Sequence, residues 1–134
     1  MEKLYLKGSA FERELKQLFE KKGFATVRSA GSHGVDLIVG KKGLIYAFEC
    51  KYTTKEKMYI SKGDVDRLIK FSEIFGAEPY IALKINSEIH FINPYLLTPT
   101  YSGKNYLLDY KKVVLISKDF LELTGEGKQT RLYI

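Results

Sequence analysis

Apolar and polar positions follow two different periods along this chain, and the periods predict its elements. Near the N-terminus the apolar residues recur at the spacing of one helix face: Phe11, Leu15, Leu18 and Phe19. Ser9 and Glu12 stand in the order of a capping box, and Gly23 provides a stop. We therefore expect a first helix that begins at Ser9 and ends at Gly23.

A strand pattern follows, with short apolar runs separated by turn residues. We expect strands at 24–28, 35–39 and 44–52, with a Gly- and Ser-rich turn at 29–34 and a hairpin turn at 40–43. Residues 44–48 are apolar at every position. Such a strand is apolar on both faces, so it should be central in its sheet and covered on both sides.

The second half of the chain alternates helix and strand patterns. The expected elements are a polar loop at 53–58, a helix from 61 to 75 that stops at Gly76, strands at 79–85 and 88–92, a short turn or helix from Pro94, a loop at 98–105, a strand at 113–116 and a short helix at 119–123. This order predicts an α/β fold with a central mixed sheet flanked by helices. The length of 134 residues fits a single domain, 1–134.

Composition narrows the setting in which the chain works. It is 45% hydrophobic and 28% charged, as in an ordinary globular protein. No apolar run approaches the roughly 18 residues of a membrane span. The N-terminus is charged at once, which does not resemble a secretion signal. Cys50 is the only cysteine, so an internal disulfide is excluded. We expect a cytoplasmic protein without a membrane partner.

The charge is positive and uneven. The formal net charge is +6, and residues 1–67 hold 14 Lys and Arg against 9 Asp and Glu. Residues 68–134 hold 8 against 7. A basic excess in one half favours a polyanionic partner such as nucleic acid, and a nucleoid location. A solvated basic surface without a partner is the alternative.

Three charged residues lie where apolar strands end. Asp36 stands in one expected strand, and Glu49 and Lys51 stand near the end of its hairpin partner. Side chains alternate along a strand, so Glu49 and Lys51 share a face, and the hairpin brings Asp36 alongside. Buried ionised groups are costly unless they are paired or bind a metal.

Two close carboxylates with a lysine suit phosphodiester hydrolysis. The carboxylates can hold Mg²⁺, with Mn²⁺ as a substitute, and the ammonium can offset charge on the transition state. A strand-end salt bridge of Lys51 is the alternative. Glu12 also remains open: local sequence makes it a capping-box acid, but its place at the edge of the apolar stripe lets it reach the end of the sheet.

Longer motifs resemble a known family. They are a Gly-Ser-x-x-Glu-Arg helix start at 8–13, an Ala-Gly-Ser-His-Gly turn at 30–34, and Asp36 with Glu49-x-Lys51 in register. Together they are similar to the archaeal Holliday junction resolvases (Hjc), which have the restriction-endonuclease-like fold and a PD-(D/E)xK site. Val35 replaces the proline of that motif. The resemblance is dense over about residues 7 to 85.

The resemblance implies a role for each matching residue. Glu12, Asp36 and Glu49 would be metal ligands, directly or through water, and Lys51 the catalytic lysine. Ser32 would approach the scissile bond. The implied phosphate contacts are Arg13 and Arg28. His33 stands in the same Gly- and Ser-rich turn as Ser32, a position typical of a solvated loop residue or a phosphate contact rather than of a catalytic base. The implied activity is metal-dependent cutting of four-way DNA junctions.

The helix at 64–75 bears apolar residues on two sides. Val65, Leu68, Ile69 and Phe75 are expected on one stripe, and Phe71 and Ile74 toward the opposite side. The second side can pack on the C-terminal segment or on another copy. The family resemblance favours a homodimer, whose two-fold symmetry matches a four-way junction and would give paired cuts.

Two other functions fit part of this pattern. One is a duplex endonuclease of the same fold, and the other is a DNA-binding module without catalysis. The short chain leaves little room for sequence-reading insertions, and the complete Asp36, Glu49 and Lys51 set argues against loss of catalysis. The tail at 127–134 holds Gln129-x-x-Leu132 followed by Tyr133, a pattern similar to sliding-clamp-binding tails.

Overall fold

A five-stranded mixed sheet forms the centre of the protein, in a computed structural model that describes residues 2–29 and 34–125. The strand order is β1-β2-β3-β5-β6. The strands are β1 (Ala25–Arg28), β2 (Leu37–Lys41), β3 (Leu44–Thr53), β5 (Glu78–Ile85) and β6 (Glu88–Ile92). Only β3 and β5 pair in parallel; the other neighbours are antiparallel. The expected α/β fold with a central mixed sheet is confirmed.

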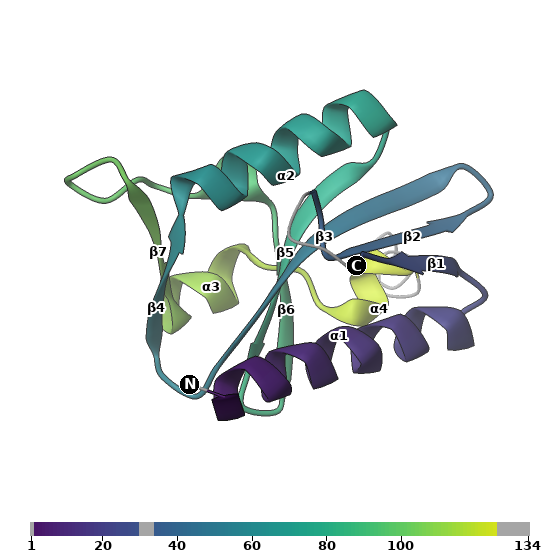
Figure 1. Ribbon diagram of the computed structural model, residues 1–134, viewed down its shortest axis with the longest axis horizontal. Coiled ribbons are helices and arrows are strands. Elements are labelled where there is room, and N and C mark those ends of the chain that lie inside the picture. The colour runs from purple at the N-terminus through teal and green to yellow at the C-terminus, as the bar shows by residue number, and fades with distance from the viewer. Residues whose placement is uncertain (1, 30–33, 126–134) are drawn as a thin grey trace, which may run out of the picture.

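Helices cover both faces of this sheet (Figure 1). Helix α1 (Glu2–Lys21) packs Phe11, Leu15 and Phe19 against one face, together with Leu123 of α4 (Phe120–Leu123). Helix α2 (Lys62–Phe75) packs Val65 and Leu68 against the other face. The middle strand β3 therefore lies between two apolar cores, as its uninterrupted apolar run predicted.

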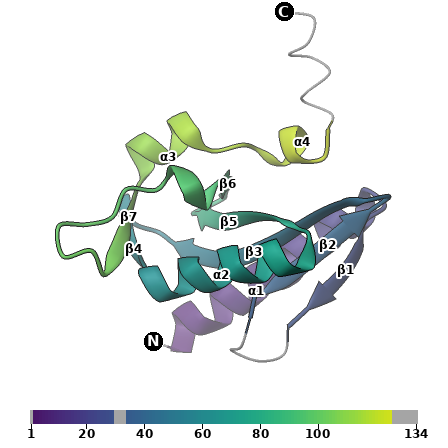
Figure 2. The same cartoon turned by 90° about the horizontal axis from the view of Figure 1, so that it is seen from above.

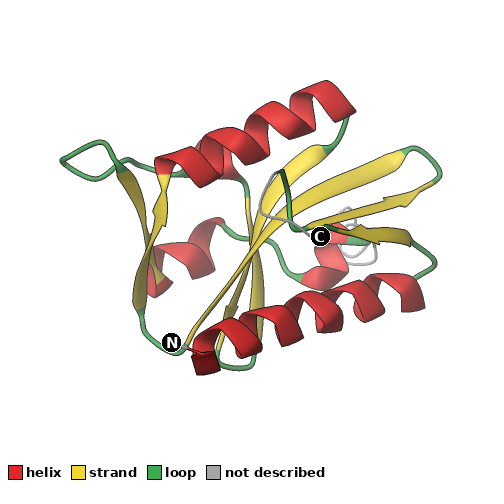
Figure 3. Ribbon diagram, in the orientation of Figure 1, coloured by secondary structure: helices red, strands yellow, loops and turns green. Residues whose placement is uncertain are grey.

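The remaining elements flank the α2 face. Strands β4 (Lys57–Ser61) and β7 (Asn105–Asp109) form a separate two-stranded sheet at the end of the molecule opposite β1 and β2 (Figure 3). The segments η1 (Pro94–Leu96) and α3 (Tyr110–Ile116) lie nearby in the fold, and α3 contacts β6 and β7. Figure 1 shows the strands of the sheet between α1 and α2, and in Figure 2, seen from above, α2 lies in front of these strands and α1 behind them. Over the described residues, no helix is long and apolar enough to span a membrane.

Local chemistry sets the turns around the future site. Lys42 and Gly43 form a two-residue hairpin turn with φ of 48° and 86°, and it registers Lys41 opposite Leu44. Ser61 caps α2 by accepting from the Asp64 N–H at 3.1 Å, and Gly76 ends the helix with φ 86°. These caps agree with the sequence-based expectation.

Three expectations about the elements are wrong. The first helix begins at Glu2, so Ser9 lies inside it and is no N-cap. The polar loop expected at 53–58 is shorter, because β3 extends to Thr53 and β4 begins at Lys57. Exposure alternates along β4, and Met58 and Ile60 point inward. Residues 113–116 belong to α3 and form no strand. A four-residue apolar run has no period long enough to separate strand from buried helix, and the Asp109 cap selects the helix.

Candidate active site

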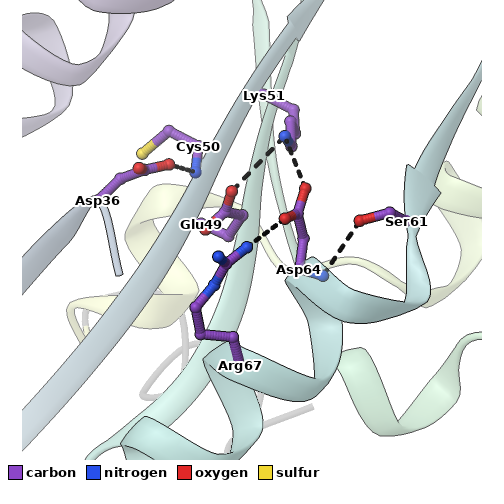
Figure 4. Close-up of polar contacts among 7 residues, drawn as sticks. All are labelled: Asp36, Glu49, Cys50, Lys51, Ser61, Asp64 and Arg67. Carbon is purple, nitrogen blue, oxygen red and sulfur yellow. Dashed lines mark hydrogen bonds and ion pairs between the residues drawn. The ribbon is translucent and has the colours of Figure 1, made fainter. Parts of the chain in front are cut away.

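Glu49 and Lys51 lie on the α2 side of β3, and Cys50 lies on the α1 side. Ala47, two residues before Glu49, belongs to the core under α2, whereas Cys50 packs with the core under α1. Burial raises the pKa of the Cys50 thiol well above its ordinary value, so the thiol stays neutral. The alternation expected from the sequence is confirmed, and it presents the two charged side chains together (Figure 4).

Asp36 is fixed beside these residues by the β2–β3 hairpin. Leu37 pairs with Phe48, and Asp36 extends this pairing because its N–H donates to the Phe48 carbonyl at 2.9 Å. The Cys50 N–H in turn donates to Asp36 Oδ2 at 2.8 Å. The carboxylate of Asp36 is thereby held against β3 at Cys50, the residue that stands between Glu49 and Lys51. The expected proximity of Asp36 to these two residues is confirmed.

The two acids are ionised only at a cost. Glu49 is 8% exposed, and burial followed by the nearby Asp36 charge raises its pKa to about 7. Burial also raises the pKa of Asp36, although the hydrogen bond from Cys50 opposes the shift. A cation placed between partly buried carboxylates that repel one another stabilises their ionised forms.

Lys51 supplies part of that positive charge. Its Nζ lies 3.5 Å from Glu49 Oε2 and 3.4 Å from Asp64 Oδ2. Burial alone would lower the pKa of Lys51, but Glu49 and Asp64 outweigh it and raise the pKa. The lysine therefore stays charged. The salt bridge that was the alternative explanation for Lys51 exists, because Lys51 contacts Glu49 and Asp64. Neither of these two contacts involves the carboxylate of Asp36.

Sequence reasoning missed Asp64 and Arg67 as members of this site. The helix expected from 61 to 75 gives Asp64 no part in the site, yet its two oxygens contact Lys51 and Arg67. Arg67 lies one turn further along α2. The available signal was an acid in the first turn of the helix that follows the Glu-x-Lys strand, but its use requires knowing that α2 docks on β3.

Glu12 lies on α1 and pairs with Arg28 of β1. Arg28 Nε is 3.1 Å from Glu12 Oε1, and Arg28 Nη2 donates to Ser9 Oγ at 2.8 Å. Burial raises the pKa of Glu12, and the charge of Asp36 adds to this. Because Ser9 is inside the helix, the capping-box role of Glu12 is wrong. The structure instead ties Glu12 to Arg28, within electrostatic reach of Asp36.

The carboxylates fit a hard divalent cation. Mg²⁺ takes oxygen ligands, keeps several waters, and is commonly held by one or two carboxylates together with substrate phosphates. Asp36 and Glu49 supply two such acids whose charges are poorly compensated. Within residues 2–29 and 34–125, no three His, Cys, Asp or Glu side chains gather closely enough to hold a metal. Glu12 therefore does not complete a three-acid cage here.

The other residues expected from the sequence divide into two groups. Arg13 is exposed on α1 next to Glu12. Ser32 and His33 lie outside the described residues, and so does the tail at 127–134.

Comparisons with known proteins show what the chain resembles. The family model described as archaeal Holliday junction resolvase (Hjc) matches residues 3–131. A crossover junction endodeoxyribonuclease Hjc from Methanocaldococcus jannaschii is 56% identical over 128 residues, covering 96% of this chain and 94% of that protein. The protein of the same description from Archaeoglobus fulgidus is 34% identical over 132 residues, covering 93% of this chain and 94% of that protein.

A solved structure extends the similarity to the fold. The structure of the Archaeoglobus fulgidus Holliday junction resolvase Hjc matches with a TM-score of 0.82 at 33% identity. The match covers 90% of this chain and 97% of that chain.

The raised pKa of Glu49 generates a prediction about cation binding. The pKa of Glu49 is about 7 in the fold and 4.5 ordinarily, so the stability that protonated Glu49 gives to the metal-free fold is fully present below pH 4.5. This stabilisation is lost as the pH rises through about 7. A divalent cation needs the ionised form. Titration with Ca²⁺ or Mn²⁺, followed by the rise in Tm, should therefore show roughly tenfold tighter binding at pH 8 than at pH 6.

Two variants separate this site from general surface charge. Glu49→Gln should bind the cation weakly and with a flat pH response. Glu56→Gln, which changes an exposed acid in the loop after β3, should behave as the unaltered protein. Equal cation affinity at both pH values in the unaltered protein would rule out Glu49 as the titrating ligand.

Proposed function

The chain belongs to the archaeal Holliday junction resolvase (Hjc) family, and from this membership we infer that it is a crossover junction endodeoxyribonuclease, a nuclease that cuts four-way DNA junctions. The observation that carries the inference is the cluster of Asp36, Glu49 and Lys51 at the end of a buried strand, in a chain that matches the family over nearly its full length. The activity is that of a divalent-metal-dependent nuclease, acting inside the cell where chromosomal DNA is found.

The cation is proposed to be Mg²⁺, with Mn²⁺ as a substitute, held by Asp36 and Glu49. Such an ion polarises the phosphoryl group and makes a water molecule more acidic. Asp36, which directly precedes β2, and Glu49 of β3 would hold it, and the hydrogen bond from Cys50 keeps the Asp36 carboxylate in place. The pKa of Glu49 near 7 means that this acid ionises close to neutral pH, in step with cation binding.

Lys51 is proposed as the catalytic lysine. Its ammonium stays charged and part-buried, where an electrostatic contact is stronger than in water. It can orient the attacking water or offset the negative charge that grows on the phosphate. Ser32, which lies between β1 and β2 in the sequence, is proposed to approach the same phosphate, and His33 to contact the DNA backbone there.

Glu12 is proposed to serve the cation through water. The support is the charge of Asp36, which adds to burial in raising the pKa of Glu12, so the two carboxylates lie within electrostatic reach of one another. Arg28 holds the Glu12 carboxylate from the other side at 3.1 Å. A ligand contact through water needs no third acid within direct reach, which agrees with the two-acid arrangement.

DNA binding is proposed to rest on phosphate contacts by basic residues. Arg13 is exposed, and both Arg13 and Arg28 act electrostatically on Glu12. The formal net charge of +6 attracts the polyanion over the whole surface. Phosphate contacts position the protein without reading bases, so recognition depends on the shape of the junction.

The outward side of α2 is proposed as the homodimer interface. Ile74 is 80% exposed and Phe75 is 51% exposed, and the Phe75 ring stacks on Phe71 with centroids 5.3 Å apart. This corrects the expected stripe, because Phe75 faces outward and Phe71 is partly buried against the core. Tyr95 and Leu96 of η1 add exposed apolar surface, and Tyr95 Oη donates to Glu73 Oε1 on α2 at 3.1 Å.

The dimer gives the enzyme two identical sites for the two-fold substrate. The alternative covering by the C-terminal segment is not made by the part of that segment up to residue 125, which leaves Ile74 and Phe75 exposed. We also propose that a sliding clamp binds the C-terminal tail through Gln129, Leu132 and Tyr133. Association with the nucleoid is proposed as part of the same DNA-processing role.

A substrate panel tests the proposed function. With Mg²⁺, the protein should cut a synthetic four-way junction in preference to a linear duplex of the same sequence or single-stranded DNA. The cuts should be paired across the junction. Cutting of the duplex at an equal rate would favour the duplex endonuclease, and tight binding to all three without cutting would favour a non-catalytic module.

Glu12 can be tested because an amide keeps its structural contact. In Glu12→Gln the amide oxygen still accepts from Arg28, but the negative charge is gone. We expect normal folding and junction binding in Ca²⁺, with single-turnover cutting at least ~100-fold slower, a barrier increase of ~2.7 kcal/mol. Glu14→Gln, on the same helix and paired with Lys84, is the control and should cut normally. An unaltered rate in Glu12→Gln would leave Glu12 as an anchor for Arg28 only.

The interface can be tested with two exposed residues. Ile74→Ala combined with Phe75→Ala removes apolar surface that each protomer would bury, and should weaken dimerisation about 100-fold by sedimentation equilibrium. Paired cutting should fall with it. Leu115 of α3 is 83% exposed, as Ile74 is at 80%, and Leu115→Ala should leave the dimer intact. An unchanged dimer in the double variant would place the interface elsewhere.

A further inference from the structure

We propose that Asp64 is a positioning residue for the catalytic lysine: it gives Lys51 an anchor on α2 that is separate from the acids of the cation site. The proposal rests on the proposed function, since it assigns Lys51 to the cutting reaction. It concerns a residue that the Asp-Glu-x-Lys pattern leaves out.

The contact that carries the proposal joins two different elements of the fold. Lys51 extends from β3 and Asp64 from the first turn of α2, and Lys51 Nζ lies 3.4 Å from Asp64 Oδ2. The same Nζ lies 3.5 Å from Glu49 Oε2. The ammonium is therefore held between two carboxylates (Figure 4), and both the Lys51 and Asp64 side chains are 27% exposed.

Asp64 is itself held firmly. Its N–H donates to the capping Ser61 Oγ at 3.1 Å, and Oδ1 accepts from Arg67 one turn along the helix. One oxygen thus serves Arg67 and the other serves Lys51. Val65 and Leu68 of the same helix are 1% and 0% exposed against the sheet, and their packing fixes the distance from α2 to β3.

The two carboxylates that contact Lys51, those of Glu49 and Asp64, differ in whether they are also proposed to bind the cation. Glu49 is a proposed ligand, so its oxygens have to serve the cation as well as Lys51. Asp64 has no such second task in this arrangement, and Arg67 keeps it ionised: burial raises the pKa of Asp64, but Arg67 and Lys51 outweigh it and lower the pKa overall. Asp64 can therefore retain Lys51 when Glu49 engages the cation.

A purely structural role for Asp64 would be helix stabilisation, since an acid in the first turn favours the helix dipole. Asp66 provides a matched comparison two residues away. It is an exposed acid on the same helix and pairs with Lys62 at 2.9 Å, away from Lys51. Asp64→Asn and Asp66→Asn each remove one negative charge from α2, but only the first removes the anchor of Lys51.

The experiment measures Tm, junction binding in Ca²⁺ and single-turnover cutting in Mg²⁺ for Asp64→Asn, Asp64→Glu and Asp66→Asn. We expect Asp64→Asn to bind the junction within about twofold of the unaltered protein and to cut at least about tenfold more slowly. Asp64→Glu should recover most of the rate because it restores the charge, and Asp66→Asn should cut normally.

A second readout does not depend on cutting. Unfolding of the metal-free protein with Asp64→Asn, Lys51→Ala and both together forms a double-mutant cycle. The two substitutions should be non-additive, because each removes the same contact. Asp66→Asn should be additive with Lys51→Ala.

The outcomes separate this proposal from the proposed function. If the unaltered protein does not cut the junction, the proposed function fails, whereas the cycle still reports on the Lys51–Asp64 contact. If it cuts and Asp64→Asn cuts equally fast, the positioning role is overturned. A slow Asp64→Asn whose loss is matched by Asp66→Asn, or by equally weakened junction binding, would also overturn it.

Discussion

The structure depends on how β3 passes from a fully buried apolar segment to buried charge. Phe48 is 0% exposed, and the next residue on the opposite face is Glu49 at 8%. Carboxylates in such a position are costly unless cations compensate them. Asp36 and Asp64 add two more acids to the same place, and Lys51 and Arg67 add two cations. The site therefore retains an excess of negative charge, which is the condition that attracts a divalent cation.

The remaining fold can be understood as the means of holding that charge in place. The two-residue turn at Lys42 and Gly43 sets the register that brings Asp36 to the backbone of Cys50. The parallel pairing of β3 with β5 places β3 inside the sheet, where α1 and α2 cover opposite faces. Each helix then contributes one acid from its side: Glu12 from α1 and Asp64 from α2. The acids come together only in the folded chain.

Sequence patterns predicted β3, its charged residues Glu49 and Lys51, and the neighbouring Asp36, because their signals are local. A continuous apolar run, strict alternation and a Gly-flanked turn determine the neighbourhood of Asp36, Glu49 and Lys51. The role of Asp64 was not predictable in this way, since it depends on the docking of a helix against a strand. The outward direction of Phe75 and the helix at Tyr110–Ile116 depend on the same kind of tertiary packing. The family resemblance was confirmed, whereas its residue roles remain proposals.

The central claim is that the buried acids beside β3 are the cutting site and that junction recognition lies elsewhere on the surface. The most direct measurement is single-turnover cleavage of a labelled four-way junction by Asp36→Asn, with excess enzyme and Mg²⁺. Asparagine still accepts the hydrogen bond from Cys50 but lacks the charge. The account predicts cutting slower by at least ~100-fold with junction affinity in Ca²⁺ preserved. Cutting by Asp36→Asn at the rate of the unaltered protein would contradict it.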